Sequence, residues 1–393
     1  MNRLPRTVVV LGVASLFTDM SSEMIYPLLP LFLTTTLGAS ALALGVIEGI
    51  AETTASVLKI ASGYWTDRVA KRKPFILAGY GLAGIVRPLI GLAAGWPFVL
   101  TMRFLDRIGK GLRTSPRDAL IADSAEPGRR GQAYGFHRSM DHAGAVLGPL
   151  IAAALLTFAG FSLRTVFLLA AIPAAIVLVV LIVGVKENPS IAPRERKTTE
   201  GEASWGLFDR NFRLYLAALL VFTLGNSTDA FILLRLSNSG VPEAWIAILW
   251  ALHHIVKMVF AYAGGTVSDT LGRRRVILLG WFVYALVYLA FGMLTSPLLL
   301  VGVFLVYGLY FGLTEPCEKA WVADLAPAQA RGAALGWYNG IVGIAALPAS
   351  LLFGFIWDRF GIFEAFATGA GFALCASILL LFVRDGTREP ARS

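Results

Sequence analysis

Pairs of acidic residues at helical spacing are the first chemically suggestive feature of the sequence. Asp19 and Glu23 are four positions apart, and Glu48 and Glu52 repeat that spacing. Residues four apart lie on one face of a helix, so each pair can present two carboxylates to the same environment. A carboxylate removed from water must be protonated or paired with a cation. The pattern indicates proton binding, and a static network of buried ion pairs is the open alternative.

A cluster of basic residues has a similar spacing. Arg103, Arg107 and Lys110 occupy positions i, i+4 and i+7, so they share one helix face. Asp106 lies alongside and offers them a negative partner. Buried charges of this kind normally face a cavity or a partner of opposite charge. Two roles stay open for the cluster: it modulates proton binding by the carboxylates, or it binds the charge of an anionic solute.

The composition identifies the environment of these residues. The chain has 393 residues, of which 56% are hydrophobic and 15% charged, and its mean hydropathy is +0.69. A soluble protein of this length needs a more polar surface, so soluble enzymes and disordered chains are excluded. The net charge of +9 fits basic residues in cytoplasmic loops, and we expect no nucleic-acid binding. The chain is predicted to be a multi-pass membrane protein.

The apolar stretches predict about twelve transmembrane helices, because a spanning helix takes about 20 apolar residues. They lie at residues 7–33, 41–64, 74–95, 97–117, 132–158, 163–185, 211–235, 243–264, 275–295, 298–318, 333–356 and 363–384. Strand-like alternation is absent, so we expect an all-α fold. The predicted parts are an N-terminal six-helix bundle at 1–185, a polar linker at 186–210, and a C-terminal six-helix bundle with a short tail at 211–393.

The distribution of Lys and Arg predicts the orientation. Most basic residues fall on one side of the predicted spans, which places both termini and the linker in the cytoplasm. Compact loops of this kind fit a bacterial inner (cytoplasmic) membrane.

The two halves of the chain also repeat each other. The loop GYWTDRVAKR, which starts at Gly63, matches GTVSDTLGRR, which starts at Gly265. Ala122-Asp123 likewise matches Ala323-Asp324. The sequence therefore predicts duplication of a six-helix unit.

The doubled loop resembles the signature G-x-x-x-D-R-x-G-R-[KR] of the major facilitator superfamily, with Ala70 at one glycine position. The resemblance implies two pseudo-symmetric six-helix bundles around a cavity that opens alternately to either side. Acidic and basic loop residues suit a conformational latch that forms and breaks, and ordinary topology-determining charge is the alternative. The latch candidates are Gly63, Asp67, Arg68, Arg72, Gly265, Asp269, Arg273 and Arg274.

Two further motifs extend the resemblance to proton-coupled exporters. Gly144-Ala-Val-Leu-Gly148-Pro149 is similar to the family's G-x-x-x-G-P motif, and its small residues and proline suit a hinge or a seal. Generic helix packing is the alternative. The stretch RIGKG, which starts at Arg107, is similar to a family motif whose arginine is linked to proton coupling, so the resemblance assigns that role to Arg107.

The candidate site residues fall into two groups. Proton-coupling candidates are Asp19, Glu23, Glu48, Glu52 and Arg107. Equivalent positions of the two halves meet near the midplane in this fold. On that basis the substrate-cavity candidates are Tyr26, Arg103, Lys110, Asn226, Asp229, Trp250 and His254. In the second half we assign only Asp229 and Lys257 to the membrane interior, so we expect the first bundle to handle ions and the second to shape the pocket.

These features predict a secondary active transporter that exports a small solute in exchange for protons. The chain lacks a Walker loop, His-Glu-x-x-His and Gly-x-Ser-x-Gly, so we expect no enzymatic activity and no cofactor. Two adjacent histidines are too few for a metal site. We expect a monomer whose partners are its solute, protons and the bilayer. Alternatives are uptake or exchange of an anionic metabolite or metal chelate, and a non-transporting receptor of the same fold.

Overall fold

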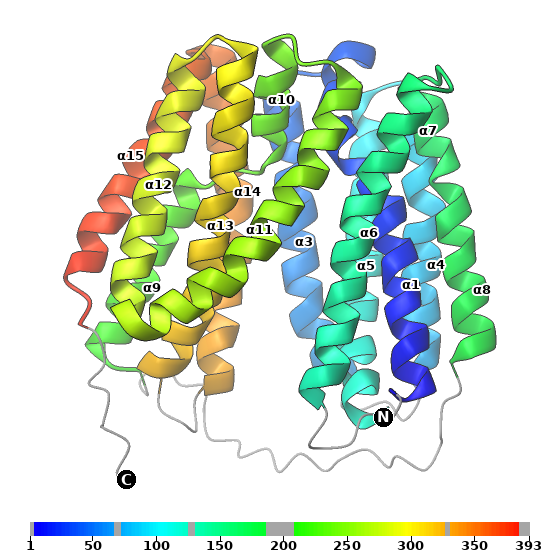
Figure 1. The fold of residues 1–393 in the computed structure, drawn as a ribbon, viewed down its shortest axis with the longest axis horizontal. Coiled ribbons are helices and arrows are strands. Elements are labelled where there is room, and N and C mark those ends of the chain that lie inside the picture. Colours follow the sequence, from blue (N-terminus) through cyan, green and yellow to red (C-terminus); the bar gives the residue numbers. More distant parts are fainter. Residues whose placement is uncertain (1–3, 67–71, 125–129, 186–207, 327–330, 385–393) are drawn as a thin grey trace. The chain divides into compact units, whose positions relative to one another are not determined.

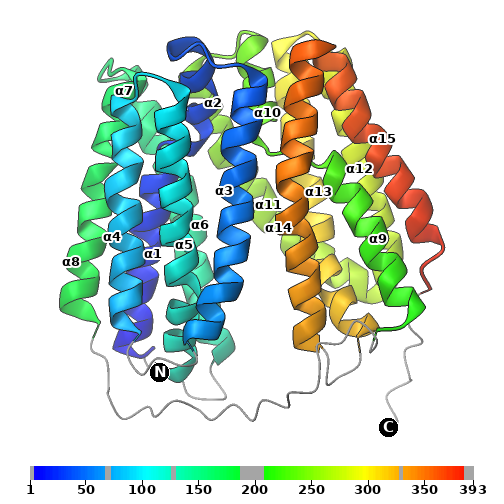
Figure 2. The same ribbon diagram turned by 180° about the vertical axis from the view of Figure 1, so that it is seen from behind.

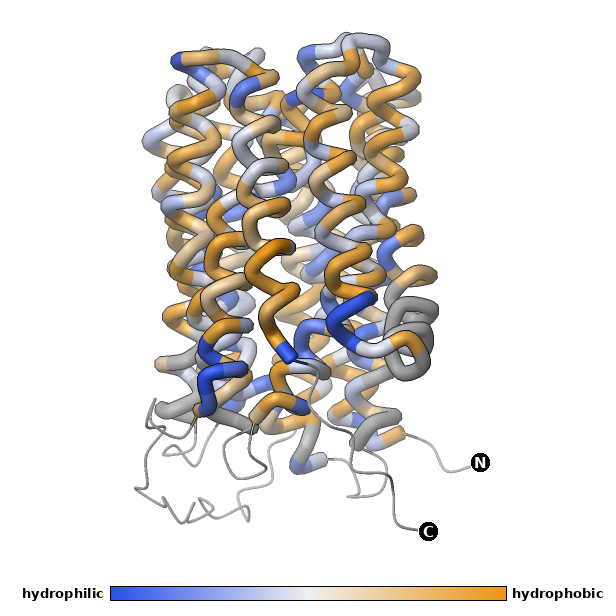
Figure 3. The backbone as a smooth tube through the Cα atoms, turned by 90° about the vertical axis from the view of Figure 1, so that its left-hand side faces the viewer, coloured by the Kyte–Doolittle hydropathy of each residue, from blue (hydrophilic) through white to orange (hydrophobic). Residues whose placement is uncertain are grey.

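The structure is a computed structural model that describes residues 4–66, 72–124, 130–185, 208–326 and 331–384 (Figure 1). Helices account for nearly all of these ranges, and none of the described residues forms a strand. The expected all-α fold is therefore confirmed. Apolar residues dominate the helices, with hydrophilic positions inside several of them (Figure 3).

The described residues form two compact units. The first contains residues 1–197 and 228–254, and the second contains 198–227 and 255–393, as far as they are described. The main helices are α1 (Arg6–Glu23), α2 (Leu29–Leu31), α3 (Ala41–Thr66), α4 (Lys73–Leu89), α5 (Trp96–Ser124), α6 (Arg130–Thr157), α7 (Leu163–Leu169), α8 (Ala171–Gly184), α9 (Arg210–Gly225), α10 (Ala230–Asn238), α11 (Glu243–Leu271), α12 (Arg273–Met293), α13 (Pro297–Leu325), α14 (Arg331–Arg359) and α15 (Ile362–Leu381). The boundary between the units passes through α11.

Eleven segments of the described chain are long and apolar enough to cross a membrane. The predicted span at 97–117 corresponds to α5, which is long enough at 29 residues but carries many charges. That helix is consequently absent from the eleven. A polar helix of this kind needs its charges buried against protein, and α5 packs closely on both α3 and α4 (Figure 2).

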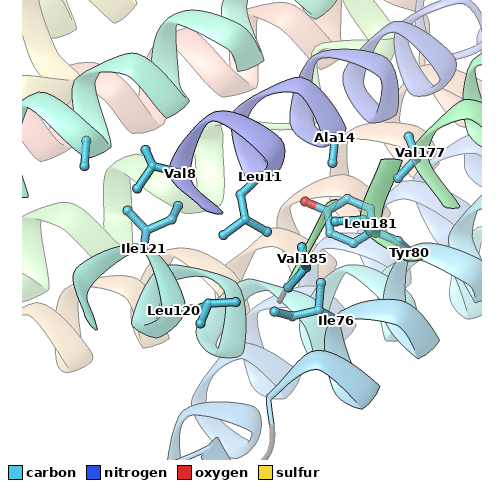
Figure 4. Close-up of a cluster of buried hydrophobic side chains, with 11 residues drawn as sticks. Val8, Leu11, Ala14, Ile76, Tyr80, Leu120, Ile121, Val177, Leu181 and Val185 are labelled. Atoms are coloured by element: carbon cyan, nitrogen blue, oxygen red, sulfur yellow. The ribbon is translucent and has the colours of Figure 1, made fainter. Parts of the chain in front are cut away.

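The first unit has an apolar core at one end of its helices (Figure 4). Val8 and Leu11 of α1 contribute to it, together with Ile121 of α5 and Leu181 of α8, and all four side chains are fully buried. Helix α1 packs against both α6 and α8. This core fixes α1 within the unit and so positions the carboxylates farther along the same helix.

The second unit is built around stacked aromatic rings. The ring centroids of Tyr284 and Tyr288 on α12 are 4.1 Å apart, and Phe222 of α9 stacks on Trp281 at 4.5 Å. Helix α15 packs against α9 and α12. Burial of large aromatic rings supplies much of the packing energy in such a core. Among the described residues, fewer charged side chains are buried here than in the first unit.

Candidate functional site

The first span is broken directly after the candidate residues at its end. Helix α1 stops at Glu23 because Pro27 has no N–H to donate to the carbonyl four positions earlier, and Pro30 interrupts the chain again. A short 3-10 helix, Tyr26–Leu28, follows before α2. Discontinuous helices of this kind form solute and ion sites in transporters. The break therefore marks the vicinity of Glu23 as the place to search for a site.

Residues of four helices or helix breaks meet around Tyr26. The indole Nε1 of Trp250 on α11 donates to the Glu23 carboxylate at 2.8 Å. The Trp250 ring lies 5.3 Å from the Tyr26 ring, and the Arg103 guanidinium lies 5.6 Å from the centroid of the same Tyr26 ring. His254 lies 5.1 Å from Trp250, ring to ring. The structure thus brings together four of the predicted cavity residues within the first unit.

The second acidic pair forms a ladder of ion pairs between α3 and α5. Arg103 binds Glu48 in a bidentate way, with Nη2–Oε2 at 2.8 Å and Nε–Oε1 at 3.0 Å. One helical turn further, Arg107 Nη1 lies 3.4 Å from Glu52. Glu48 is only 1% exposed. Bidentate pairing with arginine is a strong, charge-assisted contact, and this geometry favours for Glu48 the static ion-pair role that the sequence left open.

Asp106 lies between three arginines, one of which sequence reasoning missed. Arg87 of α4 donates to Asp106 at 2.6 Å and also to the main-chain carbonyl of Thr18 at 3.1 Å. Arg103 and Arg107 flank the same carboxylate at 3.7 and 3.8 Å. In the sequence, Arg87 stands alone next to Pro88 near the end of a predicted span. Arg87 and Asp106 lie on different helices, so no helical spacing in the sequence indicates that they pair.

The first acidic pair, Asp19 and Glu23, has different surroundings from the second. Asp19 and Glu23 make no ion pair with any Lys or Arg among the described residues, and the side-chain partner of Glu23 is the neutral Trp250. Helix α6 approaches these positions closely. A Cβ at Gly144 would lie 2.3 Å from the Leu16 carbonyl oxygen, and one at Gly148 would lie 2.6 Å from that of Met20. Only glycine allows this approach, which presses α6 onto α1 beside both carboxylates.

Three cavity candidates remain, and one of them, Asp229, follows Thr228, whose hydroxyl lies 3.5 Å from that of Tyr26. Asn226 follows the end of α9 in the second unit and donates to the hydroxyl of Tyr310 at 3.2 Å. Asp229 is half-buried at the start of α10. Lys110 is half-buried on α5, one turn beyond Arg107. The chain is again broken between α9 and α10, at the positions that match the α1 break in the repeat.

The loop motif lies partly outside the described residues. Asp67 and Arg68 belong to a range that the structure does not describe, and for Gly63, Gly265 and Asp269 only the helical backbone is described. Two of the other candidates form equivalent contacts. Arg72 pairs with Asp123, and Arg273 pairs with Asp324 at 3.3 Å. Each of these pairs joins the start of one helix to the end of the next within a single unit.

A second repeated contact was missed from the sequence. Lys73 donates to the carbonyls of Ile182 and Val185 at the end of α8, at 3.1 and 2.6 Å. Arg274 donates to those of Leu381 and Val383 at the end of α15, at 3.2 and 3.1 Å. A cation at a helix C-terminus satisfies its orphan carbonyls and complements the helix dipole. These basic residues therefore have a structural task besides any effect on topology.

One buried carboxylate contradicts the expectation that Asp229 and Lys257 are the only interior charges in the second half of the chain. Glu318 of α13 is 6% exposed and accepts hydrogen bonds from Trp281 of α12 and Tyr338 of α14. The predicted span ended at this residue, whereas α13 continues to Leu325. The sequence signal that places Glu318 inside is its position within the predicted span 298–318, where it is the last residue. Among the described residues, no group of three or more His, Cys, Asp or Glu side chains is arranged to hold a metal ion.

Comparison with known proteins identifies the family. The model of the Major Facilitator Superfamily matches residues 11–252 and 240–393. An uncharacterized MFS-type transporter of Methanocaldococcus jannaschii is 34% identical over 386 residues, which cover 97% of this chain and 95% of that protein. The chain belongs to the major facilitator superfamily. The resemblance read from its loop motifs is thereby confirmed, and the chain is a membrane transport protein by family.

More distant relatives of this superfamily member carry functional names. The multidrug resistance protein MdtH of Photorhabdus laumondii is 26% identical over 321 residues, covering 80% of this chain and 77% of that protein. Among solved structures, the nucleoside transporter NupG aligns with a TM-score of 0.82 at 13% identity, over 95% of this chain and 99% of NupG. A bacterial homolog of the lysosomal transporter Spinster gives 0.74 at 17%, over 97% and 96%. These structures agree on the fold.

Proposed function

We propose that this protein is a secondary active transporter that exports a small solute across the cytoplasmic membrane in exchange for protons. It works as a monomer by alternating access, with both termini in the cytoplasm, where most of its Lys and Arg residues are expected. The solute site is the Tyr26 cluster, formed by Glu23, Tyr26, Arg103, Trp250 and His254. A gradient must drive the cycle, because the sequence contains no Walker loop for ATP.

The observation that carries the proposal is the contrast among the carboxylates of the first unit. Glu48 and Asp106 are neutralised by arginines at 2.8 and 2.6 Å, whereas Asp19 and Glu23 make no ion pair with a described residue. A carboxylate without a counter-ion in a membrane interior gains most from binding a proton. Asp19 and Glu23 therefore become the preferred proton carriers, and Arg107, which pairs with Glu52, tunes the field around them.

A proton exchange at Glu23 has a direct route to the solute site. The carboxylate accepts a hydrogen bond from Trp250, and that indole also contacts the Tyr26 ring. Protonation weakens the hydrogen bond, because donors bind an ionised acceptor more strongly than a neutral one. Loss of the proton therefore tightens the Trp250 contact and closes the site on one face. The proton on Glu23 and the solute thus affect each other's binding through the position of Trp250.

Export rests on a relative and on one motif. The relative named multidrug resistance protein MdtH supports efflux as the direction. Gly144 and Gly148, which match the motif of proton-coupled exporters, press α6 against α1 beside Asp19 and Glu23. The alternative, uptake or exchange of an anionic solute, requires free positive charge. Arg103 is already neutralised by Glu48, which disfavours an anion in this place.

Reconstituted protein in liposomes with an imposed pH gradient tests the proposal. Ethidium, neutral aromatic compounds and anionic metabolites serve as the solute panel, and both solute movement and decay of the gradient are measured. We expect at least one cationic or neutral compound to move against its gradient. Glu23→Gln should reduce this active accumulation at least tenfold while downhill exchange persists. Glu364→Gln, at an exposed position of α15, is the matched control and should behave like the wild type.

Three outcomes decide among the readings. Equal pH dependence in Glu23→Gln and the wild type would remove Glu23 from the coupling step. Movement of anionic metabolites alone, lost in Arg103→Gln, would establish the anion alternative. If no solute moves in response to the pH gradient, the result would favour a non-transporting receptor of the same fold.

A further inference from the structure

Glu318 is enclosed by aromatic side chains in the second unit. It lies on α13, one turn before Trp321, and both residues are buried. Trp281 and Tyr338 cover its two oxygens, and Tyr215 of α9 is fully buried against the Trp321 ring at a centroid distance of 4.9 Å. Rings packed this closely around a buried carboxyl group suit the smallest of ligands. A proton is the ligand that the position can accept.

Its hydrogen bonds come from neutral groups on two neighbouring helices. Trp281 Nε1 donates to Oε1 at 3.1 Å, and the Tyr338 hydroxyl donates to Oε2 at 2.9 Å. No Lys or Arg among the described residues forms an ion pair with Glu318. This distinguishes it from Glu48 and Asp106 in the first unit, whose arginine partners fix the charge.

Other titratable groups face Glu318 from its own helix and from two neighbouring helices. On its own helix, Glu315 and Lys319 pair with each other at 2.8 Å and are about half exposed, and Cys317 is adjacent in sequence. Tyr215 faces it from α9 and Tyr338 from α14. Helix α12 presents Trp281, which does not titrate. A tyrosine hydroxyl ordinarily keeps its proton at neutral pH, so the carboxyl group is the member of this set that exchanges one.

The two donors differ in a way that lets both protonation states be satisfied. An indole N–H can only donate, so Oε1 must remain an acceptor in either state. A tyrosine hydroxyl can donate or accept. It donates to Oε2 when the carboxylate is ionised, and it can rotate to accept from Oε2–H when the group is protonated. Proton uptake thus reverses one hydrogen bond and keeps both carboxyl oxygens hydrogen-bonded.

We propose that Glu318 is a second proton-binding site, with Trp281 as the fixed donor and Tyr338 as the partner whose hydrogen bond reverses. The proton comes from water on one side of the membrane and returns to water. A contiguous ring path leads from this site to the helix break. Trp281 stacks on Phe222, Phe222 contacts Tyr310 at 5.7 Å, and Tyr310 accepts from Asn226. As a step of export this inference rests on the proposed proton coupling, whereas proton binding itself does not.

Infrared spectroscopy of the purified full-length protein in liposomes tests the site without any solute. A protonated carboxyl group gives a carbonyl stretching band that disappears on ionisation. We expect such a band to titrate within roughly pH 5 to 9, the range in which buried carboxyl groups ionise. Glu318→Gln should remove the part of this band that Glu318 contributes, beside any part from Asp19 and Glu23, and Glu315→Gln, three residues away at the exposed ion pair, should leave the band unchanged.

Tyr338→Phe provides a readout that keeps the carboxyl group. It removes a hydrogen bond that is stronger to the ionised form, so the band should persist to a pH about one unit higher. A full-strength titrating band in Glu318→Gln would overturn the inference. If that variant does not fold, an unshifted titration in Tyr338→Phe would overturn it instead. Wild-type transport that ignores pH while the Glu318 band titrates would refute the proposed function and leave this site standing.

Discussion

The two units share a scaffold and differ in their interiors. Each joins consecutive helices through an arginine–aspartate pair, Arg72–Asp123 and Arg273–Asp324, at equivalent positions of the repeat. Inside, the first unit buries carboxylates against arginines, whereas the second buries Glu318 among aromatic rings. The contacts that hold the helix ends therefore recur in both units. The interiors differ in how they satisfy a buried acid, with cations in the first unit and with neutral donors in the second.

The largest expected effect is the loss of the central acid in the first unit. Asp106→Asn leaves Arg87 without its counter-ion in a buried place, and an uncompensated buried charge costs about 3–5 kcal/mol. Denaturant unfolding of the protein in micelles measures the change in free energy of unfolding. Glu364→Gln is the control for removing an acid from an exposed position. A loss of stability below about 1 kcal/mol would mean that the buried arginines do not need Asp106 as a counter-ion.

The next effect tests how closely α1 and α6 must approach. Gly144→Ala adds a methyl group that would lie 2.3 Å from the Leu16 carbonyl oxygen, so the helices must separate at a cost of about 1–3 kcal/mol. Gly371→Ala on α15 is the matched control, because a Cβ there meets no atom within 4 Å. Thermal unfolding compares the two variants. Equal melting temperatures would show that the close packing beside Asp19 is not needed for stability.

A smaller effect is expected when the acid of the second unit is neutralised. In Glu318→Gln the amide oxygen can accept from Trp281 while the amide nitrogen donates to Tyr338, so stability should change by less than about 1 kcal/mol. The same unfolding assay applies. A loss as large as that of Asp106→Asn would show that Glu318 is held as an ion, and the contrast between the two interiors would fail.

The smallest effect concerns the shared scaffold. A double-mutant cycle with Arg72→Ala and Asp123→Ala should give a coupling energy of about 0.5–1 kcal/mol, since the pair is only partly exposed. The cycle with Arg273→Ala and Asp324→Ala should give less, because Asp324 is 54% exposed. Both couplings should fall at high salt. A reversed order would contradict the burial argument.

The sequence allowed the fold to be predicted well because its signals are local. Apolar runs and the doubled loop motif indicated the helices and the superfamily. The spacing of Glu48 and Glu52 matched that of Arg103 and Arg107, although their pairing could not be read from either stretch alone. Arg87 and Glu318 were missed because their partners lie on other helices. Only tertiary packing brings such partners together.

The ion-pair ladder between α3 and α5 has a mechanical consequence. Its acids and its arginines are both spaced by four residues, about 6 Å along a helix. If α3 slides by one turn, both original ion pairs break and one new pair forms, either Glu52 with Arg103 or Glu48 with Arg107. At intermediate displacements no such pair forms. The ion pairs therefore favour relative positions of α3 and α5 that differ by whole helical turns over the positions in between.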